Sequence, residues 1–172
     1  MTTPFRAVVA VTGMNATDNP APGVAVARSL RHDPLFQGRI IGLGYDPLDP
    51  GFYAAGLVDG GALLPIPATG RDALLHRMRE LVHQFGITVL IPTLDSELRA
   101  VASLESELRA LGVQTFVPSL DAIERSSKPQ LPKLGAAPGI QVPESEPIGS
   151  ADALPRLMQK FGLPLVVKGV YY

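Results

Sequence analysis

The sequence predicts an α/β protein with an open, mostly parallel β-sheet and helices on both faces. Five short apolar segments alternate with helical segments over roughly the first 125 residues, the order that produces parallel strands joined by right-handed crossovers. The apolar segments are nearly uninterrupted, which is typical of strands buried on both faces. Hydrophobic residues make up 46% of the chain and charged residues 18%, enough to form a core.

Each strand is predicted from a short apolar run that ends at a glycine, a proline or another turn-forming residue. We expect strands over residues 5–11, 39–43, 62–66, 87–91 and 113–117. Helices are expected over 24–31, 72–85 and 98–111, with shorter helical turns over 52–55 and 120–125. The helix over 72–85 has the clearest pattern, because its apolar residues recur at 3.6-residue spacing and Gly86 stands at the C-cap position.

The composition of the sequence changes at Ser126, after which prolines become frequent. Five prolines fall between Pro129 and Pro147; Pro129 and Pro132 fit a helix only in its first turn, and Pro138 must end it. A helical segment is expected over 152–161 and a strand over 165–167, with Lys168 at the end of that strand. A terminal strand without a following partner leaves an unpaired edge, so we expect these residues to begin a longer protein.

Composition excludes several classes of function. The 172 residues carry 15 basic and 16 acidic side chains, and a net charge of −1 gives no strong electrostatic case for nucleic acid or an anionic membrane surface. The chain has no cysteine, which excludes disulfides and thiolate metal sites. No apolar stretch approaches the roughly 20 residues of a transmembrane helix, and the N-terminus lacks a signal-peptide pattern. We therefore expect a soluble, cytoplasmic protein.

The loop after the first expected strand, residues 12–23, does not have the spacing of a dinucleotide-binding loop. Gly13 and Gly23 are ten residues apart, with two prolines between them. The loop is either a plain connection at the sheet edge or a contact for a substrate, a partner domain or an anion near a helix N-terminus. Asp46 stands where an acidic residue binds ribose in dinucleotide-binding folds. Without the glycine pattern, a nicotinamide-dependent oxidoreductase is a minor alternative.

A second loop at a strand's carboxyl end carries a hydroxyl and two carboxylates, on Thr93, Asp95 and Glu97. Ligands bind beyond the carboxyl ends of the strands in open parallel sheets, so these side chains are candidate substrate-facing groups. The alternative is helix capping, with Asp95 or Ser96 as the N-cap and Glu97 in the first turn. Both roles can coexist.

Catalytic and metal-binding patterns are not found. The three histidines, His32, His76 and His83, have no metal-ligand spacing, and no G-x-S-x-G motif occurs. We assign no catalytic residue and no metal ligand. Lys128 and Lys168 are ordinary solvated charges when taken singly, although an ammonium at the end of a buried strand is well placed for a phosphate.

Taken together, these segments resemble the ATP-grasp superfamily, and most nearly the branch with carbamoyl-phosphate synthase large chains and biotin carboxylases. Residues 1–125 (VVAVTGMNATDNPAPGVAVARSLR, RIIGLGYDP, VLIPTLDSE, PSLDAIERS) look like the Rossmann-like domain that precedes the ATP-grasp fold, and residues 126–172 look like the beginning of a truncated ATP-grasp domain. The family's DK…GIPVPES pattern is met by Ser127-Lys128 and by Gly139 to Ser145. Its GYPVVVK strand is met by Gly162 to Lys168.

The resemblance implies an ATP-dependent ligase that activates a carboxylate as an acyl phosphate, with ATP and magnesium as cofactors. Lys128 and Lys168 would contact nucleotide phosphates, and Glu97 would face the active site. The family's glycine-rich phosphate loop and magnesium-binding carboxylates lie beyond the position of Tyr172, so the chain alone is expected to be inactive. The expected partners of the full-length protein are ATP and a small carboxylate substrate. The alternative is a naturally short, non-catalytic α/β module that docks on a partner or binds a small anion.

Overall fold

The computed structural model describes residues 3–16, 21–135 and 140–169, and the chain divides into two compact units, Met1–Pro118 and Ser119–Tyr172. The division expected from the sequence, after residue 125, falls at the end of helix α5 (Leu120–Arg125).

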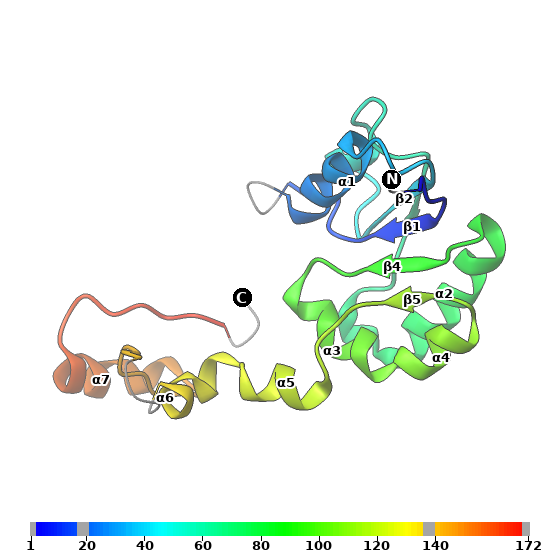
Figure 1. The fold of residues 1–172 in the computed structure, drawn as a ribbon. Helices are drawn as coiled ribbons and strands as arrows, with labels where there is room; N and C mark the ends of the chain where they lie inside the picture. Colours follow the sequence, from blue (N-terminus) through cyan, green and yellow to red (C-terminus); the bar gives the residue numbers. More distant parts are fainter. Residues whose placement is uncertain (1–2, 17–20, 136–139, 170–172) are drawn as a thin grey trace. The chain divides into compact units, whose positions relative to one another are not determined.

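The first unit is built on a five-stranded sheet in the order β3-β2-β1-β4-β5 (Figure 1). Every neighbouring pair of strands is parallel, with Val9 opposite both Ile40 and Val89 in the central register. The strands are β1 (Val8–Val11), β2 (Arg39–Gly44), β3 (Gly60–Leu63), β4 (Val89–Ile91) and β5 (Gln114–Thr115). The predicted α/β class with a parallel sheet is confirmed.

Helices cover both faces of this sheet because successive strand residues point to opposite sides. One face packs under α1 (Pro22–His32) through Val9, Val11 and Ile40. The other packs through Ala10, Ile41 and Leu90 against the helices α2 (Arg71–Phe85), α3 (Asp95–Ser103) and α4 (Glu105–Ala110). The core is therefore two apolar layers with the sheet between them.

The structure shortens two expected strands, because β4 begins at Val89 rather than residue 87 and β5 covers only Gln114–Thr115 of the expected 113–117. Three further bounds are also corrected. The first strand begins at Val8, while Phe5 makes only an isolated bridge to Phe36. The third strand ends at Leu63 rather than residue 66, because Leu64 N–H makes the last bond to Gly44 and the next residue is a proline without an N–H. The helix expected over 98–111 is two helices, since Leu104 leaves helical geometry (φ −106°, ψ 6°).

Short helices make up the second unit. After α5 come a 3₁₀ turn (Lys128–Gln130), α6 (Leu131–Leu134), a 3₁₀ turn (Ala151–Ala153) and α7 (Leu154–Phe161). Pro132 lies in the first turn of α6, as its missing N–H requires, whereas Pro138 lies outside the described residues. Glu146 joins α7 to the preceding segment through ion pairs with Arg156 and Lys160.

The strand expected over residues 165–167 is not formed. This segment is extended, but a β-strand needs a neighbour for its N–H and C=O groups, and residues 119–135 and 140–169 contain no strand to pair with it. Val166 and Val167 are consequently exposed. Within the described ranges, no helix is both long and apolar enough to cross a lipid bilayer.

Candidate functional site

The polar side chains of the first unit gather where β1, β2 and β4 end. Chain connections leave β1 toward β2 and β3 on one side, and β4 and β5 lie on its other side, so the topological switch point falls between β1 and β4. Ligands of open parallel sheets bind at such a point. Thr12 follows β1, Tyr45 follows β2, and Thr93 follows β4, which places one hydroxyl at the end of each strand.

Glu97 joins these three strand ends. It lies in the first turn of α3, is 3% exposed, and accepts hydrogen bonds from Thr12 Oγ1 at 2.5 Å and from Tyr45 Oη at 2.5 Å. The Leu94 N–H also donates to Glu97 Oε2, at 3.4 Å. The carboxyl group is therefore held by donors from three separate loops.

Burial dominates the electrostatics of this carboxyl group. Removal from water raises the pKa of Glu97 above its ordinary value of 4.5, although the hydroxyls of Thr12 and Tyr45 and the backbone N–H groups of Leu94 and Thr93 oppose that rise. None of these donors carries a positive charge, so they repay the lost hydration of the ionised form only as neutral dipoles. Glu97 accordingly takes up a proton more readily than an exposed glutamate.

The two threonines are tied to each other as well as to Glu97. Thr93 N–H donates to Thr12 Oγ1 at 2.8 Å, and Thr93 Oγ1 donates to the Thr12 carbonyl at 3.0 Å. Gly13 makes this approach possible: its φ of +74° suits glycine, and a Cβ there would collide with Thr93 Oγ1. Gly23, in the first turn of α1, leaves room in the same way for the Thr12 carbonyl.

The loop after β2 folds back onto the sheet, and its Phe52 packs against β2 and β3. Buried Asp49 accepts bonds from the N–H groups of Tyr45 (3.3 Å) and Asp46 (3.4 Å), which shapes the turn. Phe52 then occupies the space that side chains at Gly44 and Gly61 would need. Asp46 itself is exposed and accepts from Leu48 N–H, so its carboxylate shapes a turn at the position where a ribose-binding acid would stand.

The structure separates the three residues predicted on the loop after β4. Glu97 is buried and Thr93 is half-buried beside it, whereas Asp95 is exposed on the first turn of α3. The capping interpretation is corrected in part: the N-cap is Leu94, not Asp95 or Ser96. Glu97 does serve the helix start, because its side chain accepts from the N-cap N–H in the manner of half a capping box.

Sequence reasoning did not identify Thr12 and Tyr45. Each is the first polar residue after an expected strand, so a search for polar groups at every strand end would have found both. Their pairing with Glu97 has no local signal, because it spans 85 and 52 residues of sequence.

Both candidate phosphate-binding lysines belong to the second unit. Lys128 is half-buried and begins the 3₁₀ turn Lys128–Gln130. Lys168 is exposed on the extended segment, so the expectation that it ends a buried strand is wrong for the reason given above. Gly139, the first residue of the GIQVPES match, lies outside the described residues.

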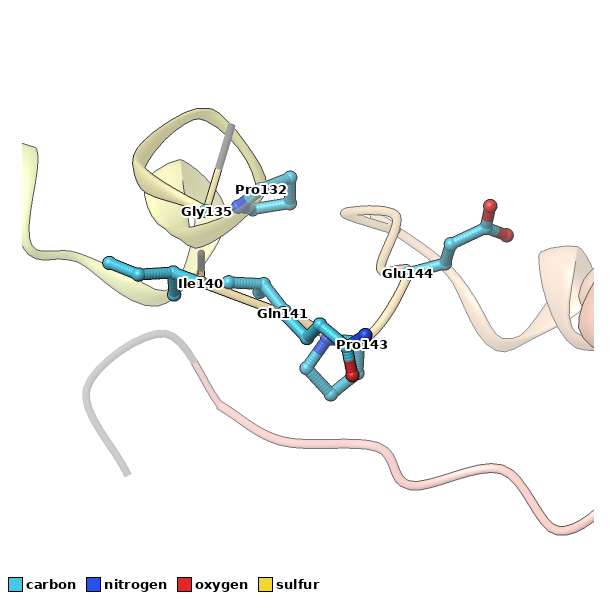
Figure 2. Close-up of a pocket in the computed structure, with 7 residues that line it drawn as sticks. Pro132, Gly135, Ile140, Gln141, Pro143 and Glu144 are labelled. Carbon is cyan, nitrogen blue, oxygen red and sulfur yellow. The ribbon is translucent and has the colours of Figure 1, made fainter. Parts of the chain in front are cut away.

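A hollow of about 510 Å³ lies in this second unit beside the remainder of that match (Figure 2). Ile140, Gln141 and Pro143 form one extended side of it, and Pro132 and Gly135 face them from α6 and its C-cap. The segment approaches α6 closely, because a Cβ on Gly135 would collide with the Val142 side chain. Glu144 is the one charged residue in the lining.

Comparison with known proteins gives structural likeness only. No family model matches the chain, and no curated protein matches it at a significant level. The biotin carboxylase domain of a single-chain bacterial carboxylase matches with a TM-score of 0.50 and 19% identity, over 93% of this chain and 35% of that chain. The biotin carboxylase domain of 2-oxoglutarate carboxylase from Hydrogenobacter thermophilus, solved with MgADP, ADP and bicarbonate, gives 0.51 and 14%, over 95% and 34%.

A single-chain, multi-domain long-chain acyl-CoA carboxylase also matches, with a TM-score of 0.50 and 18% identity, over 90% of this chain and 15% of that chain. The chain spans about a third of the length of the first two structures. At these identities the likeness concerns the fold. This chain has the α/β fold, with a five-stranded parallel sheet, found in the N-terminal region of biotin carboxylase domains.

Proposed function

We propose that this chain is the N-terminal part of an ATP-dependent ligase of the ATP-grasp type, with residues 1–125 as the domain before the ATP-grasp fold and 126–172 as the beginning of that fold. Such a ligase phosphorylates a carboxylate with ATP and lets an amine or another nucleophile displace the phosphate. The observation that carries the proposal is the match of nearly the whole chain to biotin carboxylase domains.

Lys128 and Lys168 are proposed to bind the nucleotide phosphates. An ammonium group is a compact point charge that suits phosphate oxygens, and stabilising those oxygens is the main task of a protein in phosphoryl transfer. The half-buried position of Lys128 and the exposed position of Lys168 leave both ammonium groups able to meet a ligand. Thr93, Asp95 and Glu97 are proposed to border the carboxylate site at the sheet edge.

Bicarbonate is the proposed carboxylate. The carboxylase structure from Hydrogenobacter thermophilus is a complex with this anion as well as with MgADP, and the sequence motifs resemble carbamoyl-phosphate synthase large chains as well. The charge balance of −1 supports small-molecule partners over nucleic acid, and we propose a cytoplasmic enzyme.

Magnesium does not fit the described residues as a resident ion. No group of three or more histidine, aspartate or glutamate side chains that could hold a metal occurs in residues 3–16, 21–135 and 140–169. We expect the 172-residue chain to be inactive as an ATPase.

The test begins with the intact mass of the protein purified from its native source. A mass well above 18.2 kDa, by the roughly 150 residues of a further domain, is expected. That protein should hydrolyse ATP faster when bicarbonate is added, and the 172-residue chain should not hydrolyse it. A native mass of 18.2 kDa, or a longer protein without carboxylate-dependent ATP turnover, would overturn the proposal in favour of a non-catalytic module.

The role of the lysines is tested in the same protein by the Michaelis constant for ATP. Lys128→Ala and Lys168→Ala should each raise it about tenfold, as expected for the loss of one charge-assisted phosphate contact of about 1.4 kcal/mol. Lys133→Ala is the matched control, because Lys133 is an exposed lysine of the same unit outside both motifs. Equal effects of the three variants would contradict the assignment.

A further inference from the structure

The hydroxyl of Thr12 lies between a buried carboxyl group and a second hydroxyl. Thr12 Oγ1 is 2.5 Å from Glu97 Oε2 on one side and 3.5 Å from Thr93 Oγ1 on the other. It also accepts a bond from Thr93 N–H at 2.8 Å. Glu97 is 3% exposed and Thr12 2% exposed, whereas Thr93 is half-buried, so the three groups run from the interior of the first unit toward its surface.

When Glu97 is ionised, the direction of each bond in this row is fixed. A carboxylate only accepts, so Thr12 must give its single hydroxyl proton to Glu97 Oε2. Thr93 Oγ1 then directs its own proton to the Thr12 carbonyl at 3.0 Å. In this state the Thr12 hydroxyl proton is not available to Thr93, and the 3.5 Å contact between the two hydroxyl oxygens is weak.

When Glu97 takes up a proton on Oε2, the same row of groups supports the reverse arrangement. The new O–H needs an acceptor, and Thr12 Oγ1 has a second lone pair besides the one that accepts from Thr93 N–H. The Thr12 proton is then released from the carboxyl group, and Thr93 Oγ1 is the acceptor within reach. No covalent bond other than the O–H of Glu97 forms, and its proton comes from solvent.

We propose that Thr12 is a positioning residue that transmits the protonation state of Glu97 to the hydroxyl and amide of Thr93. The two arrangements use the same three residues: the Thr12 hydroxyl donates to Glu97 when the carboxyl group is ionised and accepts from it when the group is protonated, and its own proton then turns toward Thr93 Oγ1 at 3.5 Å. Because Thr93 is the half-buried member, a ligand at the end of β4 would meet a hydroxyl that accepts a bond from Thr12 in only one of the two states.

The surroundings of Glu97 favour such a proton uptake. In the loop after β2, the Tyr45 hydroxyl donates to Glu97. The backbone N–H of Tyr45 donates to buried Asp49, which holds this loop in place. On its own helix the titratable neighbours two residues away are Asp95 and Arg99, both exposed, and the loop after β1 contributes Thr12. The side chains that donate to Glu97 are the neutral hydroxyls of Thr12 and Tyr45, and burial raises the pKa of its carboxyl group.

The test is a pH titration of the 172-residue chain by NMR, following the Glu97 side-chain carboxyl carbon and the amides of Leu94 and Thr93. Leu94 N–H donates to Glu97 directly and reports its charge, while Thr93 N–H donates to Thr12 at 2.8 Å and also interacts directly with the Glu97 carboxyl group. In the unmodified chain the three signals should shift with one midpoint, above the ordinary glutamate value of 4.5. Glu97→Gln should abolish the common shift at both amides.

The hydroxyl of Thr12 is tested by Thr12→Val, which keeps the shape and removes the O–H, and by Thr12→Ser, which keeps the O–H. The Leu94 amide should titrate in both variants. The Thr93 shift should fall to less than about half in Thr12→Val and return in Thr12→Ser, because a two-bond relay depends on its middle group. Thr88→Val, at the other end of β4, is the control and should change neither amide.

Two results would overturn the inference. One is a Thr93 shift that survives in full in Thr12→Val, since the charge of Glu97 would then act on that amide through space alone. The other is the absence of any titration at Leu94 and Thr93 in the unmodified folded chain. If Thr12→Val does not fold, Thr12→Ala gives the same comparison without the branched side chain. The inference goes beyond the ligase proposal and does not depend on it, because no measurement here involves activity.

Discussion

At the scale of the residue, the first unit is organised by a carboxyl group that several neutral donors share. Glu97 has no basic partner among its bonded groups, so its stability in the interior depends on hydroxyl and amide donors from three loops. Such a group makes the free energy of folding depend on pH, because its proton affinity differs between the folded and unfolded chain.

The sign of this dependence follows from a pKa that is raised on folding. Stabilisation from Glu97 is fully present below the unfolded-state value near 4.5 and is lost as pH rises through the raised folded-state value. The difference in unfolding free energy between the unmodified chain and Glu97→Gln should therefore shrink as pH rises through that window. Urea unfolding at a series of pH values measures it. Exposed Glu144 provides the control, and a difference that grows with pH would contradict the assignment.

Gly13 allows a second residue-scale prediction. Gly13→Ala should lose roughly 1–2 kcal/mol of unfolding free energy from its φ of +74°, and about 1–3 kcal/mol more from the collision of the new methyl group with Thr93 Oγ1. Gly86→Ala is the matched control, because Gly86 has a φ of +72° with open space around its Cα. Urea unfolding should show a clearly larger loss for Gly13→Ala; equal losses would mean that Thr93 moves aside at no cost.

The residues at this site differ in how well the sequence predicts them. Thr93 and Glu97 were identified because they follow an apolar run and precede a helical pattern, which are local signals. Tyr45 and Thr12 were missed because their role comes from pairing across 52 and 85 residues, which depends on the strand order. Single-sequence periodicity contains no information about which strands become neighbours.

At the scale of the element, the sequence predicts best those helices and strands whose stability comes from local features. Helix α2 was predicted within one residue of its observed start, because its apolar stripe and the Gly86 C-cap are encoded locally. The extended segment over 165–167 was expected as a strand from its valines, but a strand requires a partner, and periodicity supplies none. The break at Leu104 was also missed, because Leu104 continues the apolar stripe through it.

Helix α7 gives an element-scale prediction. Ion pairing with Arg156 and Lys160 lowers the pKa of Glu146 to about 2. The stabilisation from these pairs is thus present above the ordinary value of 4.5 and is lost as pH falls toward 2. Glu146→Gln should increase the rate of tryptic cleavage within α7 by about twofold at low salt, as for a solvent-exposed pair.

Glu144→Gln is the control for this prediction, because Glu144 is an exposed glutamate two residues away. High salt should bring the unmodified chain toward the behaviour of Glu146→Gln, since screening weakens surface ion pairs. A helix cleaved at the same rate in all three proteins at low salt would show that its apolar face alone holds it in place.

At the scale of the whole molecule, the two compact units differ in how much core they have. Both apolar clusters that sandwich the sheet consist of residues from the first unit. Leu157 is the one buried apolar side chain among the described residues of the second unit. Cooperative stability should therefore belong to the first unit.

A fragment of residues 1–118 should fold without the remainder. Its free energy of unfolding should lie within about 1 kcal/mol of that of the full chain, because independent units contribute additively. Circular dichroism and urea unfolding of the fragment and the full chain make the comparison. Aggregation of the fragment, or a large drop in its urea midpoint, would show that residues 119–172 complete its core.

The bonds of Glu97 also bear on the order in which the chain assembles. Its two hydroxyl donors lie 85 and 52 residues away in sequence, and β1 pairs with β4 across a similar span. Closing such long loops costs chain entropy before any contact offsets it, so we expect the Glu97 hydrogen bonds to form after the transition state of folding. Interactions absent from the transition state govern how fast a protein opens and leave the rate of folding nearly unchanged. We therefore expect the loss of these bonds, as in Glu97→Gln, to speed unfolding and to leave the folding rate nearly unchanged.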